Sequence, residues 1–428
     1  SAPSATICLW YALYSSHRSF QLNSVRKSFA VSSQLLQLSH QLFLQFLQKK
    51  GWMGVPASNT KWEGGDKNYL NKLVDNYANN NRLLSDVLEP LFFKTLNEKR
   101  NGDIADSKLG GNIKIPYLNG GLFEADDIDN LSIDFPYDYF KDLMEFFSQY
   151  NFTIDENDPD DSEVGIDPEM LGHIFENLLE DNKDKGAFYT PKEIVQYMCR
   201  QSVIQYLKTH EPSEQYAEPI EQLINDGVVS PMLQTKSMAT RFTQLLKEVK
   251  VCDPAIGSGA FPMGILYVLY HAIHHLHSHA EPHGNFNSTQ TKLDIIQNNI
   301  FGVDIDPLAV EVSKFSLLLK ALENSSLEEA EAFHQRTNQR ILPNLDKNIK
   351  NGNSLVNMAY ARFDRSVYQN VSLMNKLKMF DWNAEFGNQK FDAIIGNPPY
   401  IRVQNMVHYS REEYAATLRH SNDILGRV

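Results

Sequence analysis

Cysteine is scarce in this chain of 428 residues, and the few present cannot build a disulfide framework or a zinc finger. The three cysteines, Cys8, Cys199 and Cys252, are odd in number and widely spaced. Such usage is typical of reduced thiols in a reducing compartment. The composition therefore predicts a cytoplasmic protein without a cysteine-bound metal.

Long apolar runs and an excess of positive charge are also missing. Residues 7–14 are apolar, but this stretch is much shorter than a membrane-spanning helix, and no signal-peptide pattern surrounds it. The formal net charge is −13, so the surface as a whole would repel nucleic acid. We therefore expect no membrane association, and any contact with DNA would have to come from local basic patches.

Motifs of metal enzymes are absent as well. Six histidines gather in and after a helical segment that follows residue 260, namely His271, His274, His275, His277, His279 and His283. One pair has the i, i+4 spacing that a metal can use, but there is no His-Glu-x-x-His. A nuclease pattern of Pro-Asp followed by Glu-x-Lys does not stand out around residues 115–124. We predict a solvated or half-buried helix face here and no metal site.

The hydrophobic pattern changes character along the chain. Apolar residues recur at helical spacing over residues 24–48 and 69–97, which predicts a mainly helical N-terminal part. Further on, helical segments alternate with short apolar strands, as in α/β folds with a parallel sheet. We therefore predict a helical domain over residues 1–164 and an α/β domain over residues 165–428.

The most informative stretch is 391–400, which reads Phe-Asp-Ala-Ile-Ile-Gly-Asn-Pro-Pro-Tyr. Its apolar centre predicts a buried parallel strand, and Gly396 allows a sharp turn at the strand end. Consecutive prolines fix φ and lack an N–H, so carbonyls can face outward beside the Asn397 amide. Asn397 and Pro398 could then hold an exocyclic amine, while Tyr400 stacks on a base taken out of its helix. A proline-stiffened structural loop is the alternative.

A second strand end precedes a glycine-rich loop and a helix. The strand ends at Asp253, and Gly257 and Gly259 would bring the backbone close to a ligand at the start of the helix. A dinucleotide fingerprint would need a third glycine where Pro262 stands. The next strand-end acid, Asp304, also lies far beyond the usual separation of about 20 residues. Dinucleotide binding is therefore the weaker interpretation.

Two more strand ends carry polar side chains. In residues 300–307 an apolar strand ends at Asp304, and Asp306 with Pro307 begins a helix. Asp304 is placed to accept both hydroxyls of a ribose, with a loop anchor as the alternative. Asn353, after another short strand, could bond an adenine edge. Because the carboxyl ends of parallel strands share one edge, we expect these loops to converge.

A capping pattern stands further upstream. Thr190 and Glu193 have the spacing of a capping box, and Pro191 suits the first helical position. We predict a helix through about Leu207. The cap would explain Thr190 on structural grounds, and a ligand role for Phe188, Tyr189 or Thr190 is the alternative.

The order of five short motifs along the chain resembles that of a known protein family. Between residues 186 and 400 the motifs Gly-Ala-Phe-Tyr-Thr-Pro, Asp-Pro-Ala-Ile-Gly-Ser-Gly-Ala-Phe, Gly-Val-Asp-Ile-Asp-Pro, Gly-Asn-Ser-Leu and Asn-Pro-Pro-Tyr follow one another, and the resemblance covers roughly residues 115–400. The chain thereby resembles the gamma-class amino-methyltransferases, most of all the large adenine-specific DNA methyltransferases of restriction-modification and related phage-defence systems. The resemblance implies a Rossmann-like core that depends on S-adenosylmethionine.

The resemblance also implies roles for single residues. The positions that match the cofactor-binding motifs are Tyr189, Thr190, Asp253, Ala255, Gly257, Gly259, Asp304 and Asn353. The positions that match the catalytic loop are Asn397, Pro398 and Tyr400. An asparagine at the start of that loop favours adenine N6 over cytosine N4. The reaction implied is direct methyl transfer to double-stranded DNA, without a metal.

Other functions stay open at this point. Some members of the family are fused to a restriction nuclease domain or work with a nuclease subunit, so the parent protein could also cut DNA. Asn-Pro-Pro-Tyr occurs in enzymes that methylate RNA or protein glutamine, and the helical N-terminal part could dock a partner. The family continues after the catalytic loop with further strands and a target-recognition domain, whereas this sequence ends soon after Tyr400. We therefore expect it to be a fragment.

Overall fold

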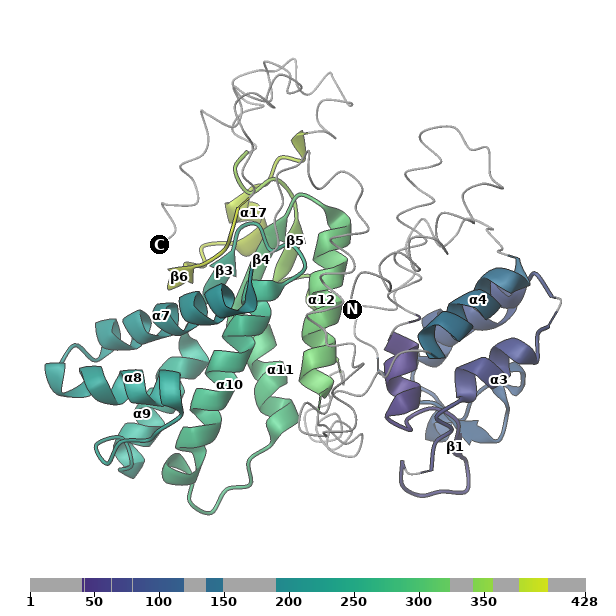
Figure 1. The fold of residues 1–428 in the computed structure, drawn as a ribbon, viewed down its shortest axis with the longest axis horizontal. Coiled ribbons are helices and arrows are strands. Elements are labelled where there is room, and N and C mark those ends of the chain that lie inside the picture. Colours follow the sequence, from purple (N-terminus) through teal and green to yellow (C-terminus); the bar gives the residue numbers. More distant parts are fainter. Residues whose placement is uncertain are drawn as a thin grey trace. The chain divides into compact units, whose positions relative to one another are not determined.

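The computed structural model describes residues 41, 43–62, 64–78, 80–118, 136–148, 190–323, 342–356 and 377–398. The chain divides into two compact units (Figure 1). The first comprises Ser1–Leu178 and Leu318–Asn344, and the second comprises Leu179–Leu317 and Leu345–Val428. The second unit contains helices and a parallel sheet, so the predicted α/β class is confirmed.

The first unit is built mainly from short helical segments. Its elements are β1 (Val55–Pro56), α3 (Tyr69–Asp75), the π-helical η1 (Leu84–Leu88) and η2 (Pro90–Thr95), the 3-10 turns η3 (Asn101–Asp103) and η4 (Ser107–Leu109), β2 (Ile113–Lys114) and α4 (Tyr137–Ser148). β1 pairs antiparallel with β2. The helix expected over residues 24–48 is described only in part, and residues 43–49 are helical.

Apolar side chains predicted to face inward in the first unit are buried. They are Leu70, Leu73, Val74, Leu83, Leu84, Val87 and Leu88. The helix expected over residues 69–97 is divided by turns at residues 76–78 and 81–82. The second part is helical over residues 83–95, with π-helical hydrogen bonding on both sides of Glu89. The core positions of this part were therefore predictable, and its helix lengths were not.

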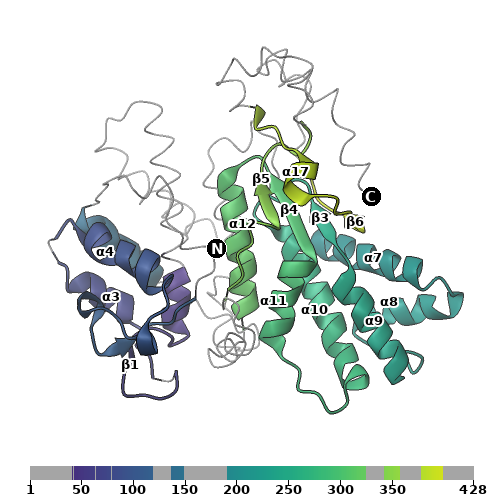
Figure 2. The same cartoon turned by 180° about the vertical axis from the view of Figure 1, so that it is seen from behind.

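The second unit has a four-stranded parallel sheet in the order β5-β4-β3-β6. The strands are β3 (Val251–Asp253), β4 (Ile300–Asp304), β5 (Ile349–Asn351) and β6 (Ala393–Ile394). Each neighbouring pair is parallel, and Figures 1 and 2 show the sheet from its two sides. The strands expected around residues 251, 300 and 393 are confirmed.

Helices and loops cover both faces of this sheet. The helices are α7 (Lys192–His210), α8 (Ala217–Asp226), α9 (Lys236–Glu248), α10 (Ala260–Ala280), α11 (Ser288–Asn298), α12 (Pro307–Leu322) and α17 (Trp382–Phe386). α10 packs on β3 and β4 and also contacts α7, α9 and α11. Cys252, Phe301 and Val303 alternate with the side chains that face α10, and they form a separate apolar cluster with Trp382 and Phe391.

Two details of these elements bear on the predictions. α12 begins at Pro307, and the Asp306 carboxylate accepts the N–H of Leu308 at 3.0 Å, so the predicted helix start is confirmed. The expectation of a fully buried β6 is wrong, because Ala393 and Ile394 are half-buried at the edge of the sheet formed by the described residues. Within the apolar run 393–395, Ile395 alone is buried.

The strand order reverses beside β3. From β3 the chain passes through α10 and α11 to β4, then through α12 to β5, and later returns to place β6 on the other side of β3. Open α/β sheets bind ligands outside the carboxyl ends of the strands at such a reversal. The loops that follow Asp253, Asp304 and Ile394 are therefore the expected ligand-binding region of this fold.

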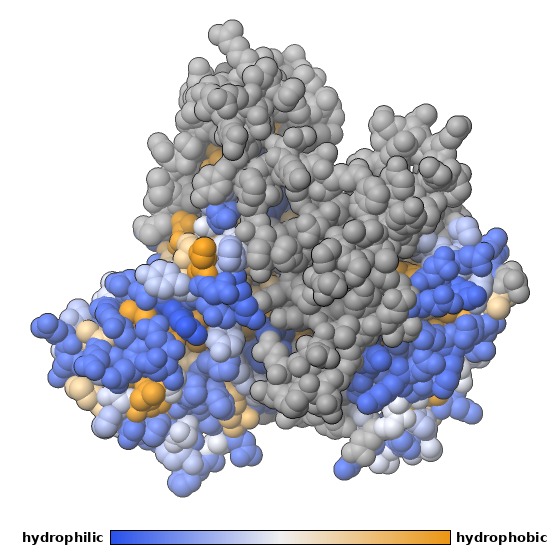
Figure 3. All heavy atoms as spheres, in the orientation of Figure 1, coloured by the Kyte–Doolittle hydropathy of each residue, from blue (hydrophilic) through white to orange (hydrophobic). Residues whose placement is uncertain are grey.

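The surface of the second unit is largely polar around its outer helices. Figure 3 shows hydrophilic residues dominating over α7, α8 and α9, with hydrophobic residues scattered among them. In the part of the chain that the structure describes, no helix is long and apolar enough to cross a membrane.

Candidate active site

The loop after β3 is shaped by one buried acid and two glycines. Asp253 is 2 % exposed, and its Oδ1 accepts the N–H of Ala255 at 2.9 Å. Gly257 and Gly259 have φ values of 53° and 93°, in the left-handed region that favours glycine. A Cβ at Gly259 would also lie 3.1 Å from the Cβ of Ser313 on α12. Both glycines are therefore required to turn the chain into α10.

The same loop is docked on the neighbouring strand β4. Ile256 donates its N–H to the carbonyl of Val303 at 3.0 Å, and its side chain fills the space over Gly302, where any Cβ would collide with it. Gly257 donates its N–H to Oδ2 of Asp304 at 2.8 Å. The glycine-rich loop and the strand-end acid, 47 residues apart, thus form one unit.

Asp304 holds two backbone segments at once. Its Oδ2 accepts from Gly257, and its Oδ1 accepts the N–H of Asp306 at 2.8 Å. Burial raises the pKa of Asp304, and these two N–H donors partly oppose the rise. The two hydrogen bonds thus show that Asp304 anchors the loops, the role that the sequence left as an alternative to ribose binding. Each carboxylate oxygen keeps a second lone pair, so a ribose role stays a prediction.

Lys378 ties the loop after β5 to the loop after β4. Asn353 donates its N–H to the carbonyl of Lys378 at 2.7 Å, and the Lys378 ammonium donates to the carbonyl of Ile305 at 2.9 Å. The Oδ1 of Asn353 accepts the N–H of Leu355 at 3.1 Å, so this side chain shapes its own turn. Nothing in the sequence marks Lys378, because a single lysine in a loop matches no motif.

Two large apolar side chains stay exposed at this edge. Ile305 is 45 % exposed directly after Asp304, and Leu355 is 40 % exposed two residues after Asn353. Exposed apolar side chains next to polar groups can pack against the two faces of a flat ring while the polar groups bond its edge. The sequence gives no sign of this, because isoleucine and leucine beside a strand indicate packing just as well.

The loop after β6 meets the loop after β3. Gly396 lies directly against the carboxylate of Asp253, and a Cβ at this glycine would overlap that carboxylate. The half-buried Asn397 donates from Nδ2 to the Oγ1 of Thr190 at 3.1 Å, and Pro398 is exposed. The first residue of the Asn-Pro-Pro-Tyr loop is therefore fixed by contacts from two other segments.

The predicted capping box at Thr190 is wrong. α7 begins at Lys192, its N-cap residue is Pro191, and no side chain caps it. The ψ of Pro191 is 141°, which leaves Thr190 outside the capping position, and the Thr190 hydroxyl bonds Asn397 instead. The helix itself is confirmed, although it extends to His210.

The described residues bring most of the predicted site to one edge of the sheet. These are Thr190, Asp253, Ala255, Gly257, Gly259, Asp304, Asn353, Asn397 and Pro398. Their segments are joined through the contacts between Thr190 and Asn397, Gly396 and Asp253, Gly257 and Asp304, and Gly352 and Asp304. The predictions for Tyr189 and Tyr400 fall outside the described residues.

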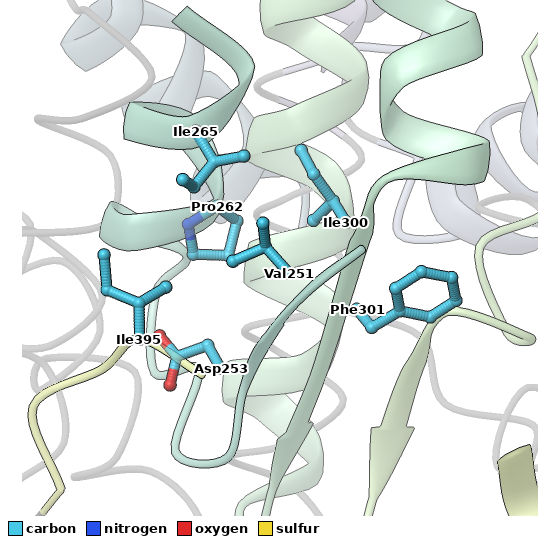
Figure 4. Close-up of a pocket in the computed structure, with 7 residues that line it drawn as sticks. All are labelled: Val251, Asp253, Pro262, Ile265, Ile300, Phe301 and Ile395. Atoms are coloured by element: carbon cyan, nitrogen blue, oxygen red, sulfur yellow. The ribbon is translucent and has the colours of Figure 1, made fainter. Parts of the chain in front are cut away.

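A small gap lies beneath this edge, between the strands and α10. It has a volume of about 10 Å³ and is lined by Val251, Asp253, Pro262, Ile265, Ile300, Phe301 and Ile395 (Figure 4). Such a volume holds one water molecule at most, whereas ligand pockets usually measure about 300–1,000 Å³. The gap therefore belongs to the core that supports the loops.

The histidines of α10 pack with aromatic rings. His274 stacks on Tyr270 with a centroid distance of 6.1 Å and contacts Phe286 at 4.7 Å. Burial, together with His275 and His277, lowers the pKa of His274. Among the described residues no group of three or more His, Cys, Asp or Glu could hold a metal ion. The predicted half-buried or solvated helix face is confirmed.

The buried Asp253 carboxyl makes a pH-dependent prediction possible. Burial raises its pKa from 3.8 to about 7, with a smaller contribution from the charge of Asp304 and an opposing one from the N–H of Ala255. The folded state then binds the proton more tightly than the unfolded state, so stability falls as pH rises between about 4 and about 7.

Asp253→Asn should remove the fall in stability with rising pH, because the amide side chain is uncharged and its oxygen can still accept the N–H of Ala255. We expect the urea midpoint of the wild type, measured relative to that of the variant, to fall between about pH 4.5 and about pH 7.5. Equal pH dependence of both midpoints would show that Asp253 does not titrate in this range.

Part of the chain matches a described protein family. Residues 298–425 match the model of the Eco57I restriction-modification methylase family. The matched segment contains β4, β5 and β6 and includes both Asp304 and Asn397. The resemblance drawn from the ordered motifs is thereby confirmed.

Two relatives extend this finding. A protein of Methanocaldococcus jannaschii, described as a candidate type II restriction enzyme and methyltransferase (RM.MjaORFECS2P), is 27 % identical over 369 residues, which are 82 % of this chain and 29 % of that protein. The adenine-specific methyltransferase BrxX of Escherichia coli O9:H4 is 30 % identical over 178 residues, 36 % of this chain and 14 % of the relative. The chain thus spans less than a third of either relative.

A solved structure shares the fold. The type IIL restriction-modification enzyme MmeI, solved in complex with DNA, aligns with a TM-score of 0.55 and 16 % identity. The alignment covers 92 % of this chain and 43 % of that chain. At this identity the likeness concerns the fold alone.

Proposed function

We propose that this chain is the methyltransferase part of a restriction-modification protein and transfers a methyl group from S-adenosylmethionine to adenine N6 in double-stranded DNA. The observation that carries the proposal is the placement of Asn397. It lies at the reversal point of a parallel sheet, fixed by Thr190 and beside the loop that follows Asp253. The name of the relative BrxX, an adenine-specific methyltransferase, supports the choice of base.

The edge of the sheet fits an adenosyl group. In this proposal Asp304, whose oxygens are aligned by two backbone N–H donors, accepts the ribose hydroxyls. Ile305 and Leu355 cover the faces of the adenine, and Asn353 bonds its edge. Tyr189, Thr190, Asp253, Ala255, Gly257 and Gly259 border the methionine portion. Residues 165–428 then form a Rossmann-like catalytic domain that depends on S-adenosylmethionine, preceded by a mainly helical domain over residues 1–164.

The catalytic loop acts on the exocyclic amine of an extruded adenine. The Oδ1 of Asn397 and the carbonyl of Pro398 accept its two N–H groups, which favours a more tetrahedral nitrogen with its lone pair free to attack. Tyr400 stacks on the base. S-adenosylmethionine supplies an electrophilic methyl group on a sulfonium centre. With the cofactor bound, the amine nitrogen would bond to the methyl carbon as the carbon–sulfur bond breaks, so that S-adenosylhomocysteine leaves as a neutral thioether and the extra proton of the amine goes to solvent.

The partners follow from the substrate. The proposal requires double-stranded DNA in the cytoplasm and no membrane. A restriction nuclease domain or subunit can accompany the methyltransferase, since one relative is described as both a restriction enzyme and a methyltransferase. The chain spans less than a third of either relative's length, so the substrates and partners of the whole protein are part of this proposal.

Nucleoside analysis tests the proposal directly. Full-length protein incubated with labelled S-adenosylmethionine and unmethylated genomic DNA should yield labelled N6-methyladenine, at one sequence motif that modified-base sequencing identifies. Parallel reactions with RNA and with total cellular protein should stay unlabelled. Label found only in RNA or in protein glutamine, or on cytosine N4, would contradict the proposed substrate.

A further inference from the structure

We propose that Thr190 is a positioning residue that sets the orientation of the Asn397 carboxamide, an inference that rests on the proposed function. The contact joins residues 207 positions apart, with Nδ2 of Asn397 donating to Oγ1 of Thr190 at 3.1 Å. Both side chains are half-buried, so water competes less well for the bond than on an open surface.

The chemistry of a carboxamide makes its orientation decisive. The two ends of the group are a donor NH₂ and an acceptor oxygen. With Nδ2 turned to Thr190, the free end of Asn397 is Oδ1, which can accept an N–H of an exocyclic amine. Rotation of the Asn397 carboxamide by half a turn would place its NH₂ next to the amine N–H. Two hydrogen-bond donors would then face each other. A contact that holds the observed orientation therefore favours the productive state.

The backbone on the Asn397 side is fixed independently of this bond. Ile395 donates its N–H to the carbonyl of Cys252 at 3.0 Å, and Gly396 lies against the Asp253 carboxylate. The main chain of Asn397 is thereby placed by β3. What remains free is the rotation of the side chain, and this is what Thr190 restricts.

The backbone on the Thr190 side is fixed as well. α7 runs for 19 residues, and its Cys199 packs over Gly264 of α10, where a Cβ would lie 2.7 Å from the Cys199 Sγ. The same thiol donates to the carbonyl of Phe261 at 3.6 Å. Thr190 thus lies just before the N-terminus of α7, a helix that packs tightly against α10. Its hydroxyl caps no helix, which leaves Asn397 as its partner.

Three variants separate positioning from other roles. Thr190→Val keeps the shape and β-branching of the side chain but removes the hydroxyl, and Thr190→Ser retains the hydroxyl. Thr209→Val is the matched control, because Thr209 lies on the exposed end of the same helix and its hydroxyl donates to the Gln205 carbonyl within that helix, at 2.8 Å. Each protein is studied at full length with an oligonucleotide that contains the methylated motif.

We expect Thr190→Val to slow single-turnover methyl transfer about fivefold to tenfold, the effect of one lost hydrogen bond at the reacting group. Cofactor affinity, measured by calorimetry, and base extrusion, followed by 2-aminopurine fluorescence, should change by less than about twofold. Thr190→Ser, which keeps the hydroxyl, should restore most of the rate that Thr190→Val loses. Thr209→Val should react at wild-type rate.

A double-mutant comparison decides the case. In the Asn397→Ala background, Thr190→Val should lower the residual rate no further, since the group it orients is gone. An additional fivefold loss there, or a loss confined to cofactor affinity, would overturn the inference while leaving the proposed function intact. A wild-type protein that methylates no DNA would overturn both.

Discussion

Replacing Asn397 with alanine should lower methyl transfer to DNA about 100- to 1,000-fold, the loss seen when one group that stabilises a transition state is removed. The variant loses the acceptor that faces the amine but leaves the strand end in place, because Ile395 and Gly396 fix the backbone through β3. Cofactor affinity should therefore change by less than about twofold. Labelled-methyl transfer and calorimetry measure the two effects separately.

The matched control for this variant is Asn225→Ala, an exposed asparagine near the end of α8 in the same unit. It should transfer methyl groups at the wild-type rate. Transfer by Asn397→Ala within about threefold of wild type would remove the catalytic assignment, whatever the behaviour of the control.

Asp304→Asn should weaken S-adenosylmethionine binding about 10- to 100-fold. The change removes the negative charge that strengthens hydrogen bonds to the ribose hydroxyls. It also turns an NH₂ toward the N–H of either Gly257 or Asp306, both of which now donate to a carboxylate oxygen at 2.8 Å. The anchored loop loses one bond in either orientation, so the effect exceeds that of the charge alone.

Calorimetric titration with S-adenosylmethionine measures this loss, and Asp226→Asn at the exposed end of α8 serves as the control. At saturating cofactor the methyl-transfer rate of Asp304→Asn should approach that of the wild type. An unchanged dissociation constant would limit Asp304 to its structural role as a loop anchor.

The sheet and its crossings could be predicted because their signals are local. β3 and β4 are short apolar runs that end in acids, and Pro307 after Asp306 suits only the first turn of a helix. Parallel strands joined by helices share one edge, so the meeting of Asp253, Asp304 and Asn397 followed from topology. Each of these inferences needs only a few neighbouring residues.

Apart from the turns that divide the helix expected over residues 69–97, the errors and omissions concern contacts between distant segments. Thr190 and Glu193 have the spacing of a true cap, but the hydroxyl has a partner 207 residues away that no local pattern reveals. The half-burial of β6 depends on its place in the sheet rather than on its own residues. The link through Lys378 and the raised pKa of Asp253 likewise arise only after loops from different strands have packed together.

The most direct test is a structure of the full-length protein with a non-reactive analogue of S-adenosylmethionine and a target duplex. The account predicts the ribose at Asp304, the methionine portion beside the loop of Gly257 and Gly259, and an extruded adenine whose amine contacts Oδ1 of Asn397. An analogue bound at another part of the molecule, or an adenine amine remote from Asn397, would contradict it.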